Sequence, residues 1–430
     1  MTSPRKAIPA YFYPLLSRED AADEEAQQRL ADALARARAP DLVYLHIPFC
    51  RDHCRFCGFY RKTLGSEAAP LDRYVDRVLA ELACWGETGL LQRGATGAVY
   101  IGGGTPSLLA PAAIERLLSG LRKALPLAEN AEISFEGEAR SLSDPERLAA
   151  LQQGGVTRVS FGVQSLDPDV RAEAGLGASL DDVQACAAAV RAAGFPVCAD
   201  LMYGLPGQTP EIFARDIELT INDLGAAMVD LYETVLYPNS PMFADRARVR
   251  ALLPDAEERK SMYGLALDGF AAAGFSHWTL EDFCRPGAEY RMKHLTYGGD
   301  SGQAQTLALG ACGVGFLAGH AYRNRVLERY LETAVDELPL ALVRRASPDE
   351  LQQRALFFYP RRLYLDPAAL QLELTPEQAL VIEQQVASGL ATRADSGRIA
   401  LTREGKLQAD RMVEQVLQGM EKRKLFKLVQ

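Results

Sequence analysis

Three closely spaced cysteines restrict the possible structures and functions of this chain more than any other feature does. They are Cys50, Cys54 and Cys57. They follow a short apolar run at residues 42–45, which we predict to be a strand leading into a loop. Thiolates spaced C-x3-C-x2-C converge on one point when such a loop wraps an iron–sulfur cluster, and most clusters take four cysteine ligands. Three cysteines leave one iron of a [4Fe–4S] cluster open to an exogenous ligand, much as a catalytic zinc site keeps one position free. The motif therefore predicts a catalytic cluster.

Two other uses of these cysteines stay open at this point. A zinc knuckle would need a fourth ligand, and His46 and His53 lie close enough in the sequence to supply one. A disulfide framework is the weaker alternative, because an intracellular chain of 430 residues does not need one. The five scattered cysteines are expected to be small buried hydrophobic residues: Cys84, Cys186, Cys198, Cys284 and Cys312.

The composition limits the classes of partner. A net charge of −9 argues against binding to a phosphate backbone as the main task. No stretch approaches the roughly 18 to 20 apolar residues of a membrane span, and the N-terminus lacks the apolar core of a signal peptide. We therefore expect a cytoplasmic protein that binds neither nucleic acid nor a membrane.

Short apolar runs alternate with longer amphipathic stretches from residue 41 to about residue 241. Crossovers of this length imply parallel strands joined by right-handed connections. Six repeats predict an α/β fold built on a partial (β/α)6 barrel, with its chemistry at the C-terminal ends of the strands. The expected strands are residues 43–46, 97–101, 132–136, 158–163, 196–202 and 228–237, and the expected helices are residues 70–84, 110–125, 144–154, 181–193 and 209–224.

The chain is expected to divide into four parts. Residues 1–40 form an N-terminal extension, either packed over the barrel or its mouth or without function as a surface arm; residues 41–245 form the barrel, and residues 246–335 cover it. Residues 336–430 form a C-terminal helical, winged-helix-like domain. Its expected elements are helices at 348–358, 376–388 and 404 to about 417, and short strands at 391–393 and 399–402. DNA binding is not expected of it, because the acidic chain offers no basic stripe.

The cysteine loop follows a Tyr-x-His-Ile-Pro-Phe strand end, and this combination resembles the radical S-adenosylmethionine (SAM) superfamily. The motifs GGGTP at residues 102–106 and GLPGQT at 204–209 extend the resemblance to the oxygen-independent coproporphyrinogen oxidase-like (HemN-like) family. By itself, a glycine run only marks a turn where the backbone can approach a ligand closely. The resemblance implies a radical SAM barrel in which Cys50, Cys54 and Cys57 hold a [4Fe–4S] cluster and SAM binds the open iron.

The resemblance also implies where SAM binds. GGGTP would hold the amino group of a first SAM, and Glu136 would contact the same molecule; the alternative for Glu136 is a solvated ion pair with Arg140. Gln164 and Asp200 match positions that hold a second SAM in the coproporphyrinogen oxidases. The full cofactor-binding set is Tyr44, Phe56, Gly103, Gly104, Thr105, Glu136, Gln164, Asp200 and Val314, the last within a glycine-rich turn expected to close over SAM. Family members often carry a SAM-binding arginine near residues 175–177; this chain has none there, and Arg171 is a candidate replacement.

Two departures from the family pattern narrow the reaction. Phe59 stands where the coproporphyrinogen oxidases have a fourth cysteine, and the residues after Phe283-Cys284-Arg285-Pro286-Gly287 lack the HNxxYW heme motif of the chaperone branch. What remains resembles the anaerobic heme-degrading enzymes and the HemN-like C-methyltransferases and cyclopropanases. That branch implies two SAM molecules, one as the source of a 5′-deoxyadenosyl radical and one as the methyl or methylene donor to an sp2 carbon. Decarboxylation of a porphyrinogen, cyclopropanation of a natural product and heme chaperoning stay open as alternatives.

The expected partners are an unsaturated small-molecule substrate, with heme or another tetrapyrrole as the candidate, and an electron donor such as flavodoxin or ferredoxin. Six side chains are candidates for contact with the substrate, and for each a structural role is the alternative. They are Glu233, Tyr237, His277, Arg285, Lys293 and His294.

Overall fold

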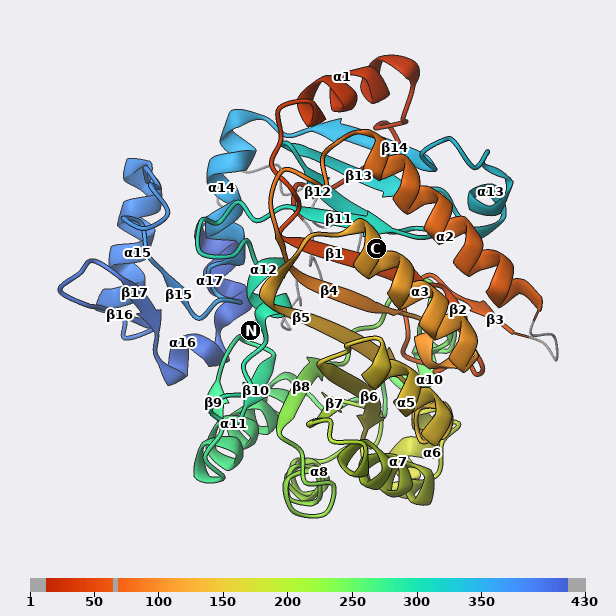
Figure 1. Ribbon diagram of the computed structural model, residues 1–430. Helices are drawn as coiled ribbons and strands as arrows, with labels where there is room; N and C mark the ends of the chain where they lie inside the picture. The colour runs from red at the N-terminus through yellow and green to blue at the C-terminus, as the bar shows by residue number, and fades with distance from the viewer. Residues whose placement is uncertain (1–12, 65–68, 417–430) are drawn as a thin grey trace.

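The computed structural model describes residues 13–64 and 69–416. Six parallel strands form its centre, in the spatial order of the sequence (Figure 1). These strands are β1 (Leu42–Ile47), β4 (Thr96–Gly103), β5 (Leu127–Gly137), β6 (Arg158–Gln164), β7 (Val197–Tyr203) and β8 (Met228–Glu233). The predicted partial (β/α)6 barrel is confirmed, and its C-terminal strand ends meet at one edge. The last strand is shorter than expected, because β8 ends at Glu233 and residues 234–237 leave the sheet.

A layer of helices covers the outer face of these strands (Figure 1). In α3 (Pro111–Ala124), four apolar residues repeat at helical spacing and are buried on the side that faces the sheet. They are Ile114, Leu117, Leu118 and Leu121. The connecting helices are α2 (Ala69–Glu87), α3 (Pro111–Ala124), α4 (Ala139–Leu142), α5 (Pro145–Gln153), α6 (Pro168–Ala174), α7 (Leu180–Ala192) and α8 (Pro210–Asn222), with a 3-10 turn η1 (Pro106–Leu108) after β4.

The sheet continues beyond the barrel on both sides, which the sequence patterns did not predict. One edge gains β11 (Thr306–Leu309), β12 (Val314–Leu317), β13 (His320–Asn324) and β14 (Leu340–Arg345), and the other gains β10 (Asp282–Cys284) and β9 (Ser276–His277). β11 pairs in parallel with β1, and the rest are antiparallel. Because β14 pairs with β13, this strand belongs to the large sheet, whereas the division at residue 336 assigned it to the C-terminal domain.

Shorter elements join these strands and frame the barrel mouth. They are β2 (Phe49–Cys50), β3 (Lys62–Thr63), α9 (Pro241–Ala244), α10 (Arg246–Val249), α11 (Ala256–Ala272), α12 (Arg291–Thr296) and α13 (Leu327–Glu332). The N-terminal segment lies against the added strands, since α1 (Glu24–Leu34) packs on β14 and Ala21 forms a bridge with Leu342.

The C-terminal elements gather at one side of the sheet (Figure 1) around a small core of their own, which includes Leu356, Ile382 and Ile399. They are α14 (Pro348–Phe358), β15 (Tyr364–Leu365), α15 (Pro376–Ala387), β16 (Ala391–Arg393), β17 (Ile399–Leu401), α16 (Arg403–Leu407) and α17 (Ala409–Val416). The single last helix predicted from residue 404 is two short helices, and its expected end lies outside the described residues. Among the described residues, no helix is both long and apolar enough to cross a membrane.

Candidate functional site

The cysteine loop leaves the end of β1 and is fixed by backbone and side-chain bonds. Its start pairs with β3, because Lys62 N donates to Pro48 O (2.6 Å) and Leu64 N donates to Cys50 O (2.9 Å). Its far side is fixed by Arg61, whose Nη1 donates to the carbonyls of Cys57 (2.9 Å) and Phe59 (2.8 Å). The loop is therefore positioned by its backbone pairing with β3 and by the Arg61 side chain.

The three thiols line one cavity of about 460 Å³. Burial, together with the neighbouring Cys57 and Cys50, raises the pKa of the Cys54 thiol to about 12. Burial also raises the pKa of Cys50, while a hydrogen bond from Thr105 lowers it. Three thiols that share one space are a donor set that a cluster, whose irons compensate the thiolate charge, would fit.

Zinc fits this loop less well than a cluster does. His46 uses both ring nitrogens, with Nδ1 at 2.8 Å from Tyr44 Oη and Nε2 at 3.1 Å from Tyr60 O, and burial lowers its pKa to about 4. His53 is exposed and does not line the cavity. Sulfurs around one tetrahedral zinc lie about 4 Å apart, yet within the described residues the loop cysteines form no group of three ligand atoms all within 4.8 Å of one another.

The glycine turn after β4 packs against the start of the cysteine loop. Gly104 N donates to Ile47 O (2.7 Å), and Thr105 N donates to Phe49 O (2.6 Å). A Cβ at Gly104 would lie 2.5 Å from Phe49 O and 2.8 Å from Ile47 O, so only glycine allows this approach. The turn and the loop therefore form one wall of the cavity.

Glu136, at the end of β5, faces the glycine turn. Its Oε2 accepts a hydrogen bond from Gly103 N at 3.0 Å, and burial raises its pKa to about 7. Arg140 is not its partner, because Arg140 pairs with Asp52 and Glu138 instead. The carboxylate is thus a hydrogen-bond acceptor in the cavity wall, beside a turn that leaves room for a ligand.

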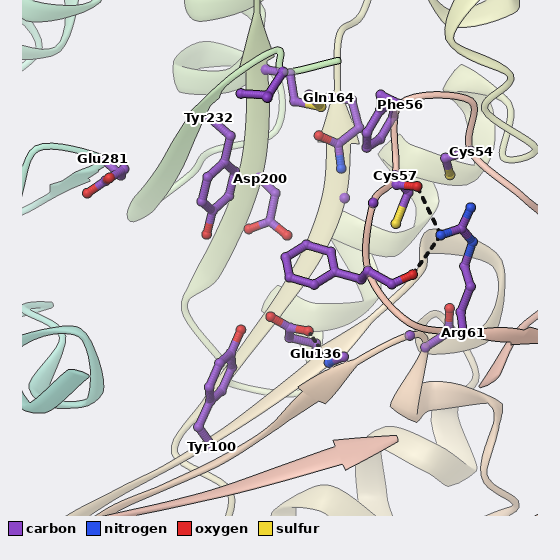
Figure 2. Close-up of a pocket in the computed structure, with 18 of the residues that line it drawn as sticks. Cys54, Phe56, Cys57, Arg61, Tyr100, Glu136, Gln164, Asp200, Tyr232 and Glu281 are labelled. Atoms are coloured by element: carbon purple, nitrogen blue, oxygen red, sulfur yellow. Dashed lines mark hydrogen bonds between the residues drawn. The ribbon is translucent and has the colours of Figure 1, made fainter. Parts of the chain in front are cut away.

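A second polar set lies across the same cavity. Figure 2 shows Gln164, Asp200 and Phe56 around the space that Glu136 and Cys57 also face. Gln164 adopts a φ of 65°, an uncommon conformation for a residue other than glycine, where β6 ends. Burial raises the pKa of Asp200 well above its usual range, and the charges of Asp230 and Glu136 add to this. Asp200 and Glu136 are therefore two of the carboxyl groups that line this cavity.

Many family members carry a SAM-binding arginine near residues 175–177, and this chain does not. An arginine from another element lies close to this position. Arg171 lines the cavity, but its Nη1 donates to the carbonyls of Val163 and Ser165 (2.8 Å each) and its Nη2 to that of Ala178. Instead, Arg140 of α4 reaches the position, and a Cβ at Gly177 would lie 3.1 Å from its Nη2. Arg140 lines the cavity, so a guanidinium is present there after all.

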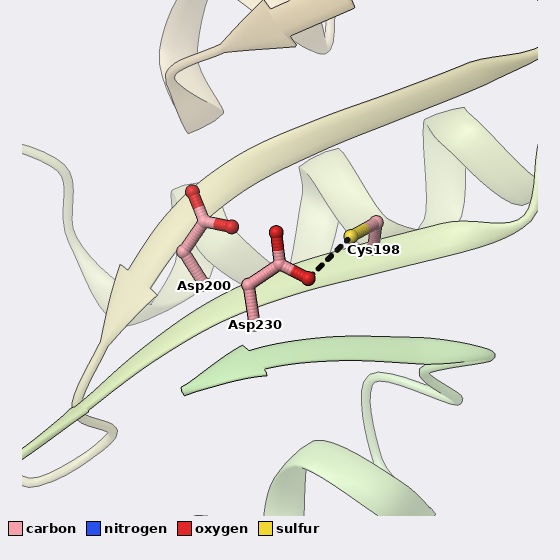
Figure 3. A group of neighbouring side chains, drawn as sticks. All are labelled: Cys198, Asp200 and Asp230. Carbon is pink, nitrogen blue, oxygen red and sulfur yellow. Dashed lines mark hydrogen bonds between the residues drawn. The ribbon is translucent and has the colours of Figure 1, made fainter. Parts of the chain in front are cut away.

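A buried ion network supports the wall that carries Asp200 (Figure 3). Ligand atoms of Cys198, Asp200 and Asp230 lie within 4.8 Å of one another, but the chain's own cations occupy this group. Arg158 Nη2 lies 3.1 Å from Cys198 Sγ and 3.4 Å from Asp230 Oδ2, and Lys293 Nζ lies 3.4 Å from the same carboxylate oxygen. Ion pairs with Arg158 and Lys293 therefore hold Asp230 in this group.

The six substrate candidates fall into two groups. Glu233, Tyr237 and Lys293 line the cavity, although Lys293 is paired with Asp230 and with Asp282 (3.2 Å). The other three do not line it, which corrects the sequence-based expectation. His277 stacks on Phe283, Arg285 is exposed over the ring of Phe275, and His294 pairs with Asp300.

The cofactor-binding set chosen from the sequence lines the same cavity as the three cysteines, and their individual roles stay predictions. The sequence patterns missed other lining residues, because these come from a strand interior, from the turn between β9 and β10 or from the distant C-terminal module. They include Tyr100, Glu281, Arg354 and Arg361, of which Figure 2 labels the first two. Only their place in three dimensions identifies them.

Comparison with known proteins fits this geometry. Residues 44–220 match the radical SAM superfamily. The chain is 31% identical over 412 residues to anaerobilin synthase of Escherichia coli O157:H7, covering 91% of this chain and 88% of that protein. It is 31% identical to the heme chaperone HemW of Lactococcus lactis (69% and 76% covered) and 32% identical to the oxygen-independent coproporphyrinogen III oxidase of Cereibacter sphaeroides (64% and 59%). The structure of Escherichia coli coproporphyrinogen III oxidase (HemN) aligns with a TM-score of 0.76 at 24% identity, covering 90% and 92%.

Proposed function

Because the chain belongs to the HemN-like radical SAM family, whose members use a [4Fe–4S] cluster and SAM, we propose that it transfers a methyl or methylene group from a second SAM to an unsaturated tetrapyrrole. One observation carries this proposal. The cavity that holds the three cysteines carries hydrogen-bond acceptors at two places, Glu136 at the end of β5 and the pair Gln164 and Asp200 on β6 and β7. The ammonium group of SAM donates hydrogen bonds, so a SAM held by Glu136 leaves the second place for another SAM.

The residues have distinct roles in this proposal. Cys50, Cys54 and Cys57 would hold the cluster, which supplies the electron that splits SAM. The glycine turn and Glu136 would orient the first SAM, with Tyr44 and Val314 in the surrounding wall. The second SAM would lie against Gln164, Asp200 and Phe56, with Gly104 and Thr105 between the two ligands.

The reaction balances with two electrons from an external donor. The first electron would cleave the first SAM into methionine and a 5′-deoxyadenosyl radical. This radical would take one hydrogen atom from the methyl group of the second SAM. The methylene radical adds to an sp2 carbon of the substrate. The second electron breaks the methylene C–S bond and releases S-adenosylhomocysteine, and a proton shift leaves a methyl group on the product. The chain's part is to hold the two SAM molecules in contact and to exclude water.

The donor is a flavodoxin or ferredoxin in this proposal. Arg51, Phe59 and Lys62 are exposed around the cysteine loop and would face such an acidic partner near the cluster. The chemistry also requires a reducing cytoplasm, where free thiols persist.

Heme is the first substrate to test, because one relative named above is a heme chaperone and another is a coproporphyrinogen III oxidase. The reconstituted protein would be incubated anaerobically with SAM and dithionite, with heme, with coproporphyrinogen III and with neither. The proposal predicts that heme raises both 5′-deoxyadenosine and S-adenosylhomocysteine and that a methylated tetrapyrrole forms. Carbon dioxide from coproporphyrinogen without S-adenosylhomocysteine would indicate a decarboxylase. Stoichiometric heme binding with neither nucleoside would indicate a chaperone.

A further inference from the structure

Arg354 of α14 is a buried cation in the wall of the cavity. Only 3% of the residue is exposed. Among the buried arginines of the described residues, Arg158 forms an ion pair with Asp230, whereas Arg77, Arg171 and Arg362 donate to uncharged oxygens. Arg354 likewise forms no ion pair with any carboxylate among residues 13–64 and 69–416. It is thus a charge that the described chain leaves uncompensated inside a ligand-sized space.

The guanidinium is nevertheless held in one orientation. Its Nε donates to Tyr13 O (3.2 Å) and its Nη1 donates to Gly302 O (2.8 Å). It also lies over the rings of Phe316 (4.6 Å) and Phe358 (5.1 Å). Within the described part of the chain, its Nη2 donates no hydrogen bond, and this nitrogen is not among the fully buried unpaired atoms. One donor therefore stays available on a rigid fork.

The electrostatics favour an anionic ligand at this position. Burial lowers the pKa of Arg354 to about 10, and Asp41 is the one carboxylate that acts to raise it. Asp41 is already paired with Arg38 and accepts a hydrogen bond from Gln305 N (2.6 Å). A buried cation without a counter-charge is costly, and a carboxylate that accepts a hydrogen bond from Nη2 would reduce this cost.

Arg354 lies at the opposite end of the cavity from the cysteines. Phe316, beneath the guanidinium, pairs with Thr306 in the sheet, and Thr306 pairs with Leu42 at the start of β1. Cys50 follows the end of the same strand. Six residues of β1 at 3.3 Å each separate the two ends by roughly 17–20 Å. Tyr44 and Tyr100 line the cavity along this length, so its walls suit a long, flat and largely apolar ligand.

We propose that Arg354 binds a carboxylate of the tetrapyrrole and so fixes which edge of the ring faces the cluster end of the cavity. This inference rests on the proposed function, since it takes a tetrapyrrole as the substrate. It identifies the group that recognises the acid side chains of that substrate. It also gives a reason why the C-terminal module and the N-terminal segment pack against the barrel. Arg361 is not equivalent, because Glu281 already accepts its charge.

Equilibrium binding tests the anchor without turnover. Heme and heme dimethyl ester would be titrated, by absorbance, into the anaerobic cluster-loaded protein with SAM present. The native protein should prefer the acid over the ester by at least about tenfold, the strength of one charge-assisted hydrogen bond. Arg354→Gln should abolish the preference, and Arg354→Lys should keep part of it. Arg393→Gln, which changes an exposed arginine of the same module paired with Glu383, should leave it intact.

Iron content and thermal unfolding would show whether each variant folds. If Arg354→Gln does not fold, the result for Arg354→Lys decides whether the inference holds. The inference is overturned if the native protein binds acid and ester equally, if it does not bind heme, or if the folded Arg354 variants keep the full preference. A clear acid preference that depends on Arg354, without S-adenosylhomocysteine in the turnover assay, would contradict methyl transfer and leave the anchor standing.

Discussion

At the scale of single residues, Glu136 should make SAM binding depend on pH. Its pKa is raised to about 7 by burial, so it is neutral below that pH and anionic above it. Because SAM is cationic, its affinity should fall by roughly tenfold between pH 8 and pH 6 as Glu136 takes up a proton. The Glu136→Gln variant, which imitates the protonated form of Glu136, should bind SAM weakly at both pH values. Calorimetric titration of SAM into the cluster-loaded protein at each pH measures this.

The matched control for Glu136 is Glu129→Gln, which alters an exposed acid of the same strand. That variant should keep the pH dependence of the native protein. A Glu136→Gln variant that retained the same dependence would show that another group titrates.

Cys54 should be indispensable for iron binding although it carries the most strongly raised thiol pKa of the loop. Cys54→Ala removes one of three ligands, so the reconstituted variant should lose the cluster absorbance and form no 5′-deoxyadenosine. Cys84→Ala, which removes a thiol outside the cavity, should retain both. Full iron content in Cys54→Ala would rule out the assignment of this thiol.

Residue-level prediction from the sequence worked where a motif is local. The cysteine spacing, GGGTP and the strand-end position of Glu136 can be recognised in short windows, and the structure brings these residues to one cavity. The substrate candidates His277, Arg285 and His294 lie outside this cavity, which the sequence could not show, because a polar residue in a short strand, loop or short helix carries no sequence signal about the direction in which its side chain points. Arg354 could not be found, since its isolation from carboxylates exists only in the folded chain.

At the scale of elements, the close contact between the glycine turn and the cysteine loop should not tolerate a side chain. Gly104→Ala places a methyl group 2.5 Å from Phe49 O, and overpacking of this kind costs about 1–3 kcal/mol. The two segments should move apart, and SAM cleavage should fall by roughly tenfold to a hundredfold.

A second glycine offers a control of the same chemical change. Gly86 lies in α2, and a Cβ added there would meet nothing within 4 Å, so Gly86→Ala should stabilise the fold by about 0.5 kcal/mol and leave activity unchanged. Thermal unfolding and the nucleoside assay measure both variants. Native activity in Gly104→Ala would mean that the contact is unimportant.

Elements were predictable where they were long and periodic. All six barrel strands and the five main helices follow from alternation and from 3.6-residue periodicity. The added strands β9 to β14 have two to six residues, and their pairing with neighbouring strands, parallel for β11 with β1 and antiparallel for the others, fixes their place in the sheet. β14 illustrates the consequence, since its pairing with β13 and not its own sequence places it in the large sheet.

At the scale of the whole molecule, one ion pair should couple the C-terminal module to the barrel. Arg361 pairs with Glu281, whose other oxygen accepts a hydrogen bond from Tyr297 at 3.1 Å, and both paired side chains are 11% exposed. Arg361→Met leaves a buried carboxylate uncompensated and should lower the free energy of unfolding by roughly 3 kcal/mol. Adding Glu281→Gln to this variant should recover much of the lost free energy of unfolding. Chemical denaturation of both variants would measure this. Additive losses in the double variant would contradict the coupling.

The central claim is that one cavity brings two SAM molecules into contact so that one abstracts hydrogen from the other. Anaerobic turnover with SAM that carries a fully deuterated methyl group, followed by mass spectrometry of the nucleosides, tests it most directly. The account predicts deuterium in 5′-deoxyadenosine together with release of S-adenosylhomocysteine. Unlabelled 5′-deoxyadenosine without S-adenosylhomocysteine would contradict it, because the radical would then take its hydrogen from the substrate.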